Sequence, residues 1–268
     1  MRISSAERSA NYLVLGLFAI FAIYPLLGVV VGALGTDSGS APGGLANFAE
    51  AWRVGHFGDY LRTSATVSLV VVAVSTVLSI MAGYAFGTMR FPGRDVVFYL
   101  FLLGIMMPAE AIVVPLYFDL RTVGLTDTFW ALALPQIAQS VAFGTFWLRA
   151  YFRTSSRAVV EAARLDGAGT FRTLWSVLVP LARPAIVTLV VLTFMWTWNE
   201  FLIPLVMIPS NEALRTAPLG LGFFQGQYTQ GFALLAAGAC IVAFPVVLVY
   251  LFLQRHFISG MLEGAVRE

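Results

Sequence analysis

Long apolar runs separated by short polar joints make up most of this sequence. A helix that crosses a bilayer requires roughly 20 mostly apolar residues, and six runs reach that length. We therefore predict an all-α membrane protein with six transmembrane helices. The predicted spans cover residues 11–34, 64–89, 96–118, 129–150, 184–208 and 231–253. Clusters of proline, glycine and small polar residues, which end regular structure, separate several of them at 36–40, 91–94, 124–127 and 209–212.

The composition agrees with extensive contact to lipid. Hydrophobic residues make up 59% of the 268 residues and charged residues only 11%, whereas a soluble domain carries about 25% charged residues. So few charged groups cannot cover the surface of a chain of this size. The single cysteine, Cys240, excludes an intrachain disulfide. The two histidines, His56 and His256, lie far apart in the sequence and do not suggest a metal site.

The first apolar run admits a second interpretation, a cleavable signal peptide. Arg2 and Arg8 precede the run, and residues 33–35 loosely resemble a cleavage site. The apolar core is longer than the roughly 7–15 residues of a signal peptide. We therefore predict a retained span.

The distribution of arginine predicts the orientation in the membrane. All 16 basic residues are arginine, and six spans place both termini on one side. With that side inside, 12 arginines face the cytoplasm and 4 face outward, as the positive-inside rule requires. The inner set is Arg2, Arg8, Arg90, Arg94, Arg149, Arg153, Arg157, Arg164, Arg172, Arg183, Arg255 and Arg267. We predict a cytoplasmic N-terminus at 1–10, a six-helix domain at 11–253, and a cytoplasmic tail at 254–268.

The cytoplasmic loop between the fourth and fifth spans, residues 151–183, contains two short predicted helices. Ser155 and Ser156 can cap a helix that begins near Arg157 and runs to Leu165. Gly167 suits the left-handed position just past a helix end.

The second helix is predicted at 171–178. Thr170 can cap its start and Pro180 can end it, and Pro184 suits the first turn of the next span. Helices this short are marginal in water by themselves, and several apolar residues here have no lipid to face. These are Val159, Val160, Leu165, Phe171, Leu174 and Trp175. Two interpretations remain at this point: the loop docks into a groove of another protein, or it packs on the inner ends of its own spans.

The residues of this loop resemble a known signature. Glu161-Ala162-Ala163, then Gly167, then Val177-Leu178-Val179-Pro180 is similar to the EAA signature of permease subunits of ATP-binding-cassette (ABC) importers. The family pattern ends in Ile-x-Leu-Pro, and valines take both apolar places here. Residues 161–168, the Trp198-Asn199-Glu200-Phe201 stretch with Pro204-Leu205, and the tail from Gln254 resemble the carbohydrate branch, in particular the maltose-type second permease subunit.

The resemblance implies a type I ABC importer permease fold in a bacterial inner membrane. It also implies four kinds of partner: a second homologous permease subunit, two ATPase subunits, an extracellular or periplasmic sugar-binding protein, and membrane lipid, with no nucleic acid. In that family the EAA loop is a coupling helix that docks in a cleft of the ATPase. The docking residues would be Glu161, Ala162, Ala163, Leu165, Asp166 and Gly167.

No cofactor is expected on this chain, and no enzymatic activity. ATP and Mg²⁺ would be bound by the partner ATPase, since the chain has no lysine and the phosphate-binding G-x-x-x-x-G-K-[ST] motif requires one.

Polar residues inside the predicted spans suggest a substrate path. Ionisable groups at membrane depth cost roughly 2.5–3.5 kcal/mol and indicate function by default. Glu110 and Glu200 lie roughly 21–24 Å above the inner ends of their spans at 1.5 Å per residue. We predict a polar vestibule in the outer half of the bilayer, where amide, carboxylate and aromatic groups suit sugar hydroxyls. Its predicted residues are Glu110, Gln136, Gln139, Trp198, Asn199 and Glu200. The alternatives are hydrogen bonds between helices only, or a Glu200 near the outer headgroups.

Prolines and glycines within the spans predict local features of packing. Pro108, Pro115, Pro135 and Pro204 would bend or interrupt helices, as packing kinks or along a cavity. Gly83 and Gly87 form a G-x-x-x-G pair that permits close helix packing.

The outer loops at 35–61 and 209–230 are predicted as surfaces for the binding protein. The first of them is equally well interpreted as a solvated connector.

The sequence fits two other classes of protein, stand-alone transporters and membrane enzymes, less well. A stand-alone secondary transporter or channel often shows internal repeats, none of which is found here, and has no need of an EAA loop. A membrane enzyme would need a nucleophile with its base or a metal set, and neither H-E-x-x-H nor G-x-S-x-G is present.

Overall fold

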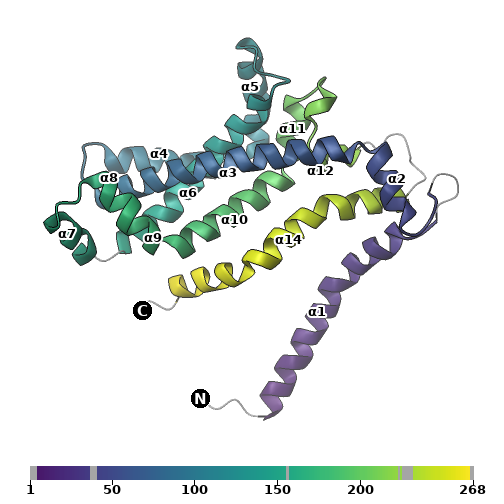
Figure 1. Ribbon diagram of the computed structural model, residues 1–268, viewed down its shortest axis with the longest axis horizontal. Coiled ribbons are helices and arrows are strands. Elements are labelled where there is room, and N and C mark those ends of the chain that lie inside the picture. Colours follow the sequence, from purple (N-terminus) through teal and green to yellow (C-terminus); the bar gives the residue numbers. More distant parts are fainter. Residues whose placement is uncertain (1–4, 37–40, 155–156, 223, 225–231, 266–268) are drawn as a thin grey trace. The chain divides into compact units, whose positions relative to one another are not determined.

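The computed structural model describes residues 5–36, 41–154, 157–222, 224 and 232–265, and the regular structure in these ranges is helical (Figure 1). The longer helices are α1 (Ser5–Ala33), α2 (Ala46–Val54), α3 (Phe57–Thr88), α4 (Arg94–Met106), α5 (Ala109–Thr122), α6 (Phe129–Thr154), α7 (Arg157–Leu165), α10 (Arg183–Asn199), α11 (Leu202–Met207) and α14 (Phe232–Ala265). The short elements are α8 (Thr170–Arg172), the π-helix η1 (Thr173–Leu178), α9 (Val179–Leu181), the 3₁₀-helix η2 (Glu212–Leu214) and α12 (Ala217–Gly220).

The helices form two compact units. Unit 1 consists of Met1–Gly58 and Gly220–Phe244, and unit 2 of Asp59–Leu219 and Pro245–Glu268. Helices α3 and α14 begin in unit 1 and continue in unit 2. The predicted division into an N-terminus, a six-helix domain and a tail stays a prediction, and α14 continues as a helix beyond residue 253.

Three described helices are long and apolar enough to cross a membrane, and five spans result if each of two bent helix pairs counts as one. The three are Glu7–Ala33, Phe57–Thr88 and Phe232–Gln254. Helix α6 covers the fourth predicted span without a break. Helix α6 is less apolar than the three helices above, as expected from the Gln136, Gln139 and Ser140 side chains within it.

Two of the predicted spans are not single continuous helices. The predicted interruption at Pro108 is confirmed, whereas Pro115, Pro135 and Pro204 lie inside α5, α6 and α11. The third span bends by 101° between α4 and α5. Met107 is extended there, with φ −74° and ψ 125°, because the ring of Pro108 disfavours helical backbone in the residue before it. The fifth span ends as a helix at Asn199 and resumes as α11 at Leu202. The first outer loop, predicted as a surface for the binding protein or a solvated connector, contains α2 and the start of α3.

Close backbone contact joins the long helices of unit 2, where α3, α4, α6 and α10 run side by side (Figure 1). A Cβ atom added to Gly83 would lie 2.8 Å from Cβ of Leu148, and one added to Gly87 would lie 3.0 Å from Cβ of Phe152. The predicted role of the glycine pair in close helix packing is therefore confirmed for α3 against α6. Gly144 of α6 makes a similar approach to the Ser79 side chain of α3.

Unit 1 is organised around one buried amide. The Nδ2 of Asn47, in α2, donates to the backbone oxygens of Ala33 at 2.9 Å and Gly35 at 2.7 Å. Its Oδ1 accepts from the N–H of Gly43 at 2.8 Å. The side chain thus ties the end of α1 to α2 and satisfies backbone groups that would otherwise be buried without partners. Phe57 and Phe224 stack nearby, with ring centroids 6.0 Å apart.

Asp127 holds two loops together at the end of unit 2 where α5 ends and α6 begins. Its Oδ1 accepts the N–H groups of Ser210 and Asn211, both at 3.0 Å. Its own N–H donates to the Met207 oxygen at 3.0 Å. The residue has φ of 58°, a left-handed conformation that Asp and Asn tolerate better than other residues with a Cβ atom.

Asp127→Ala is therefore expected to destabilise the chain by about 2 kcal/mol, through loss of the carboxylate bonds and the left-handed strain on alanine. Asp127→Asn keeps an acceptor oxygen and the backbone preference, and should cost less than about 1 kcal/mol. Thermal unfolding of the full chain in detergent measures both. Equal losses for the two variants would contradict the account.

Candidate functional site

The EAA segment (residues 157–182) begins with α7, an amphipathic helix of nine residues, Arg157–Leu165. This helix and its end are as predicted. Gly167 has φ of 78°, and its N–H donates to the Arg164 oxygen at 3.0 Å, while the N–H of Ala168 donates to the Ala163 oxygen at 2.9 Å. These two bonds form a Schellman cap, which satisfies carbonyls at a helix end. The predicted cap by Ser155 and Ser156 lies outside the described residues.

The second half of the segment is helical for longer than predicted. Thr170 was predicted as the cap, but it is already helical and Gly169 takes the cap position without a side-chain bond. The helix also does not end at Pro180, since α9 continues to Leu181. Proline is accepted there because residues 173–178 form a π-helix, whose wider turn accommodates local departures from α-helical bonding. Pro184 lies in the first turn of α10, as predicted.

A shared apolar core anchors the EAA segment to three long helices. Hydrogen bonds reinforce it: Tyr151 Oη donates to the Leu181 oxygen at 2.7 Å, and Trp147 Nε1 donates to the Ala185 oxygen at 3.0 Å. The buried members of the core are Ile80 and Tyr84 of α3, Leu148 and Phe152 of α6, Leu174, Leu178 and Ala182 of the EAA segment, and Ala185 and Leu189 of α10. A displacement of the segment would therefore be transmitted to α3, α6 and α10 together.

The opposite side of the segment is exposed and partly apolar. Leu165 is 89% exposed and Phe171 is 71% exposed, although both are large hydrophobic side chains. Glu161, Ala162 and Asp166 are exposed beside them. We call Glu161, Ala162, Leu165, Asp166 and Phe171 the EAA face. Ala163 is buried and so belongs to the inner side of α7, and a Cβ on Gly167 would have no atom within 4 Å.

The two interpretations of the loop are thus not exclusive. Val160 and Trp175 pack against the shared core and Leu174 is part of it, which satisfies the interpretation that the loop packs on its own helices. Leu165 and Phe171 take no part in that core. A short amphipathic helix that packs on a core with one side and exposes apolar side chains on the other is the arrangement expected for docking to another protein.

A second candidate region is a crevice of about 390 Å³ at the bend between α4 and α5. Gly104, Ala109, Leu134, Ala142 and other apolar residues of α4, α5 and α6 line it, together with Ile203 of α11. Gln139 is the polar side chain in this lining. The bend at Pro108 therefore opens space beside a polar group of α6.

The structure does not gather the six predicted substrate-path residues around this crevice. Gln139 lines it, whereas Gln136 is buried, with its Nε2 donating to the Leu132 oxygen at 2.8 Å. Trp198 is buried. Asn199 is exposed and its Nδ2 donates to the Met195 oxygen at 2.7 Å.

Both glutamates lie beside helix breaks. The Oε1 of Glu200 accepts the N–H of Ile203 at 3.0 Å, so this carboxylate caps the start of α11, where negative charge is favoured. Glu110 is exposed in the first turn of α5. Its depth cannot be obtained by counting residues along a straight span, because α5 leaves the direction of α4 by 101°.

Of the buried anchoring residues of the EAA segment, the sequence singled out Leu174 but not Leu178 or Ala182. Leu178 is 1% exposed, although it occupies the variable position of the Ile-x-Leu-Pro pattern. The sequence signal that could have identified the others was the run of apolar residues from Leu174 to Leu181 at helical spacing.

In the second predicted outer loop, Arg215 forms an ion pair with Glu212 at 2.9 Å. Gln225, Gln227 and Tyr228 of this loop lie outside the described residues.

Comparison with known proteins identifies the class. The profile of the family described as "Binding-protein-dependent transport system inner membrane component" matches residues 75–262. The probable ABC transporter permease protein YurM of Bacillus subtilis is 33% identical over 259 residues, covering 94% of this chain and 86% of the relative. The trehalose transport system permease protein SugB of Mycobacterium tuberculosis is 31% identical over 272 residues, which cover 98% of this chain and 99% of the relative.

A solved structure shows the same fold. It is that of a bacterial ABC transporter involved in the import of the acidic polysaccharide alginate, with a TM-score of 0.77, 23% identity, and 96% of this chain and 99% of that chain covered. The broken apolar helices and these matches define a multi-pass membrane protein of a transport system. More particularly, the chain belongs to the family of binding-protein-dependent transport system inner membrane components. It is a permease subunit of an importer rather than an enzyme, and a stand-alone carrier is not favoured.

Proposed function

We propose that this chain is one of two permease subunits of a sugar importer, and that the EAA face couples it to a separate ATPase. The observation that carries the proposal is the position of the EAA segment. One side of it shares a core with α3, α6 and α10, and the other presents Leu165 and Phe171 outward. Closure of the ATPase dimer on ATP would thus move three helices through one rigid contact.

The proposed arrangement has six spans with both termini cytoplasmic. In this arrangement the bent pair α4–α5 forms the third span, α6 the fourth, and α10 with α11 the fifth. The excess of arginine on the side of the EAA segment supports this orientation. The partners would be a homologous permease subunit, two ATPase subunits that bind the ATP and Mg²⁺, and an extracellular or periplasmic sugar-binding protein.

The relatives support a carbohydrate as substrate. SugB is named for trehalose, and the transporter of similar fold imports alginate. These are a neutral disaccharide and an acidic polysaccharide, so the shared property is a surface of hydroxyl groups. Gln139 beside the crevice and Glu200 at the break of the fifth span offer the hydrogen-bonding groups that hydroxyls require.

Affinity purification of the tagged chain from native membranes tests the assembly. We expect a second permease and an ATPase to be recovered with it, and the binding protein to be recovered when its sugar is present. Recovery of the chain by itself under conditions that keep other membrane complexes intact would refute the proposal.

The substrate path is tested by uptake of labelled sugar. Gln139→Ala removes a hydrogen-bonding group and is expected to lower uptake about fivefold, which corresponds to about 1 kcal/mol for one neutral bond. Glu200→Gln keeps an acceptor for the Ile203 N–H, so the helix start should survive while the negative charge is lost. Gln136→Met, at a buried position of the same helix outside the crevice, serves as the control. Uptake at the wild-type rate in both test variants would exclude these residues from the path.

A further inference from the structure

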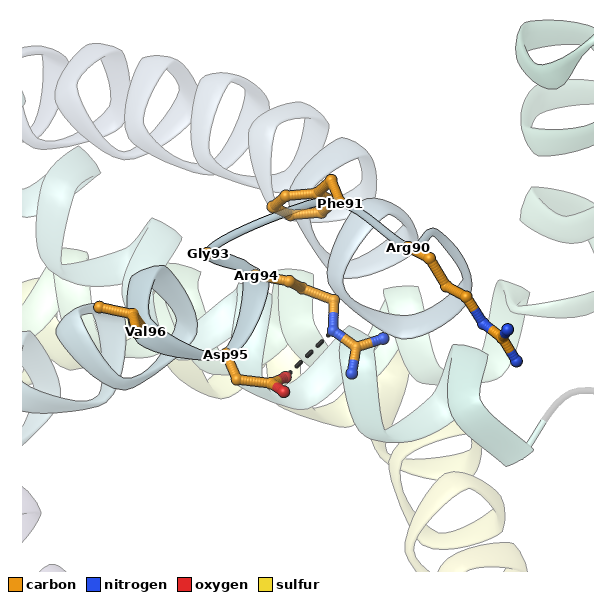
Figure 2. Close-up of a pocket in the computed structure, with 6 residues that line it drawn as sticks. All are labelled: Arg90, Phe91, Gly93, Arg94, Asp95 and Val96. Carbon is orange, nitrogen blue, oxygen red and sulfur yellow. Dashed lines mark hydrogen bonds and ion pairs between the residues drawn. The ribbon is translucent and has the colours of Figure 1, made fainter.

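A basic pocket lies at the turn between α3 and α4, and none of its lining residues belongs to the EAA face or to the crevice. It has a volume of about 400 Å³ and is lined by Arg90, Phe91, Gly93, Arg94, Asp95 and Val96. Figure 2 shows Arg90 projecting from the residues that follow α3 and Arg94 from the first turn of α4. Gly93 permits the turn, with φ of 78°.

Positive charge is concentrated around this pocket. Arg149 of α6 lies close enough to Arg94 and Asp95 to interact with both electrostatically. Three arginines, Arg90, Arg94 and Arg149, thus lie at or near this turn together with Asp95. Asp95 is already engaged, because its Oδ1 accepts from Arg94 Nε at 3.0 Å. Within the described part of the chain, Arg90 has neither an ion-pair nor a hydrogen-bonding partner.

Two of these three guanidinium groups, those of Arg149 and Arg94, are held in place by contacts within the chain. The Arg149 guanidinium lies 3.7 Å from the centroid of the Phe98 ring, a favourable cation–π contact, and its Nε donates to the Phe86 oxygen at 3.4 Å. Arg94 also donates from Nη1 to the Met89 oxygen at 3.3 Å. Fixed guanidinium groups suit phosphate, which they can bind through paired N–H bonds.

An apolar strip leads away from the pocket along α4. Val96 lines the pocket, and Leu100 and Leu103 follow it at spacings of four and three residues, on one side of the helix. All three are exposed. Positively charged side chains thus lie next to an exposed apolar strip. A molecule with an anionic headgroup and a hydrocarbon tail would match both.

We propose that the α3–α4 turn binds the headgroup of an anionic phospholipid, whose acyl chain lies along Val96, Leu100 and Leu103. The phosphate would contact Arg94, and Arg90, whose side chain points away from Arg94 in Figure 2, would change rotamer to join it. The net positive charge would select an anionic over a zwitterionic headgroup. The inference does not depend on which substrate is transported. Near a membrane surface each such arginine contributes about a fivefold gain in binding to anionic lipid.

The test uses the purified full-length chain in neutral detergent. Equal amounts of phosphatidylglycerol and phosphatidylcholine are offered, and the lipid that stays bound is measured by native mass spectrometry. We expect phosphatidylglycerol to be retained preferentially. Arg90→Gln, which breaks no side-chain hydrogen bond or ion pair within the described residues, should weaken retention about fivefold, and Arg90→Gln with Arg94→Gln roughly thirtyfold. The corresponding double lysine variant keeps the charge and should keep most of the retention.

The matched control is Arg62→Gln with Arg121→Gln, which removes two arginines from the other end of unit 2 and should leave retention unchanged. Three outcomes would overturn the proposal. These are equal retention by the wild type and the double glutamine variant, equal retention of the two lipids, and complete displacement of phosphatidylglycerol by millimolar inorganic phosphate, which would assign the pocket to a soluble anion.

Discussion

Leu165→Glu is expected to weaken binding of the ATPase about thirtyfold and to leave the stability of the chain unchanged. The side chain is 89% exposed, so its replacement removes no internal packing. In the proposed complex the leucine would be buried, and full burial of such a side chain contributes about 1.5–3 kcal/mol. A loss of about 2 kcal/mol corresponds to roughly thirtyfold in affinity. The carboxylate would in addition be desolvated at the interface, which raises the cost.

The measurement is the affinity of the purified chain, reconstituted with its partner permease, for the ATPase. Leu165→Met conserves volume and apolar character and should bind within a few-fold of the wild type. Leu45→Glu makes the same chemical change at another exposed leucine, in unit 1, and should have no effect. Wild-type affinity in Leu165→Glu would show that the EAA face is not the docking surface.

Leu178→Ala is expected to have the largest effect on stability, about 2–5 kcal/mol of unfolding free energy. The side chain is 1% exposed in the core that α3, α6 and α10 share with the EAA segment. Truncation leaves a cavity whose walls belong to four segments, and close-packed interiors relax only partly around such a void. The segment should then move independently of the long helices. We therefore expect ATP hydrolysis to continue while sugar uptake per ATP falls.

The structure offers a matched control three residues away. Leu181 belongs to the same segment but is 54% exposed, so Leu181→Ala should change stability by less than about 0.5 kcal/mol. Its backbone oxygen still accepts the bond from Tyr151. Thermal unfolding, ATPase activity and uptake are compared for the two variants. Similar results for Leu178→Ala and Leu181→Ala would mean that the shared core does not couple the segment to the spans.

Local sequence signals predicted local structure well. The helix from Arg157 to Leu165, the left-handed Gly167 and the close packing at Gly83 all depend on residues within a few positions of one another or on the absence of a side chain. Such features follow from the conformational range of glycine and the periodicity of one helix. The structure agrees with each of them.

The errors arose where neighbours along the chain gave no information about neighbours in space. Thr170 has the right side chain for a cap, but the helix begins one residue earlier than such a cap allows. Pro108 was predicted to bend or interrupt its helix, but the depth of Glu110 was counted along a straight span, and the bend of 101° places Glu110 off the axis of α4. Hydropathy averages over a window and so does not register a sharp bend between two equally apolar halves.

By itself, the sequence determined that this chain lies in a membrane and that a short amphipathic helix interrupts its apolar runs, and it predicted that most of its basic residues belong on one side. These properties depend on composition and periodicity, which the solvation of side chains dictates. Only the tertiary structure decided which face of that helix stays exposed, which of Gln136 and Gln139 lines a crevice, and that Arg149 of α6 lies over the Phe98 ring of α4. Each of these depends on the packing of segments distant in the sequence, and one helix cannot encode which of its faces a neighbour will cover.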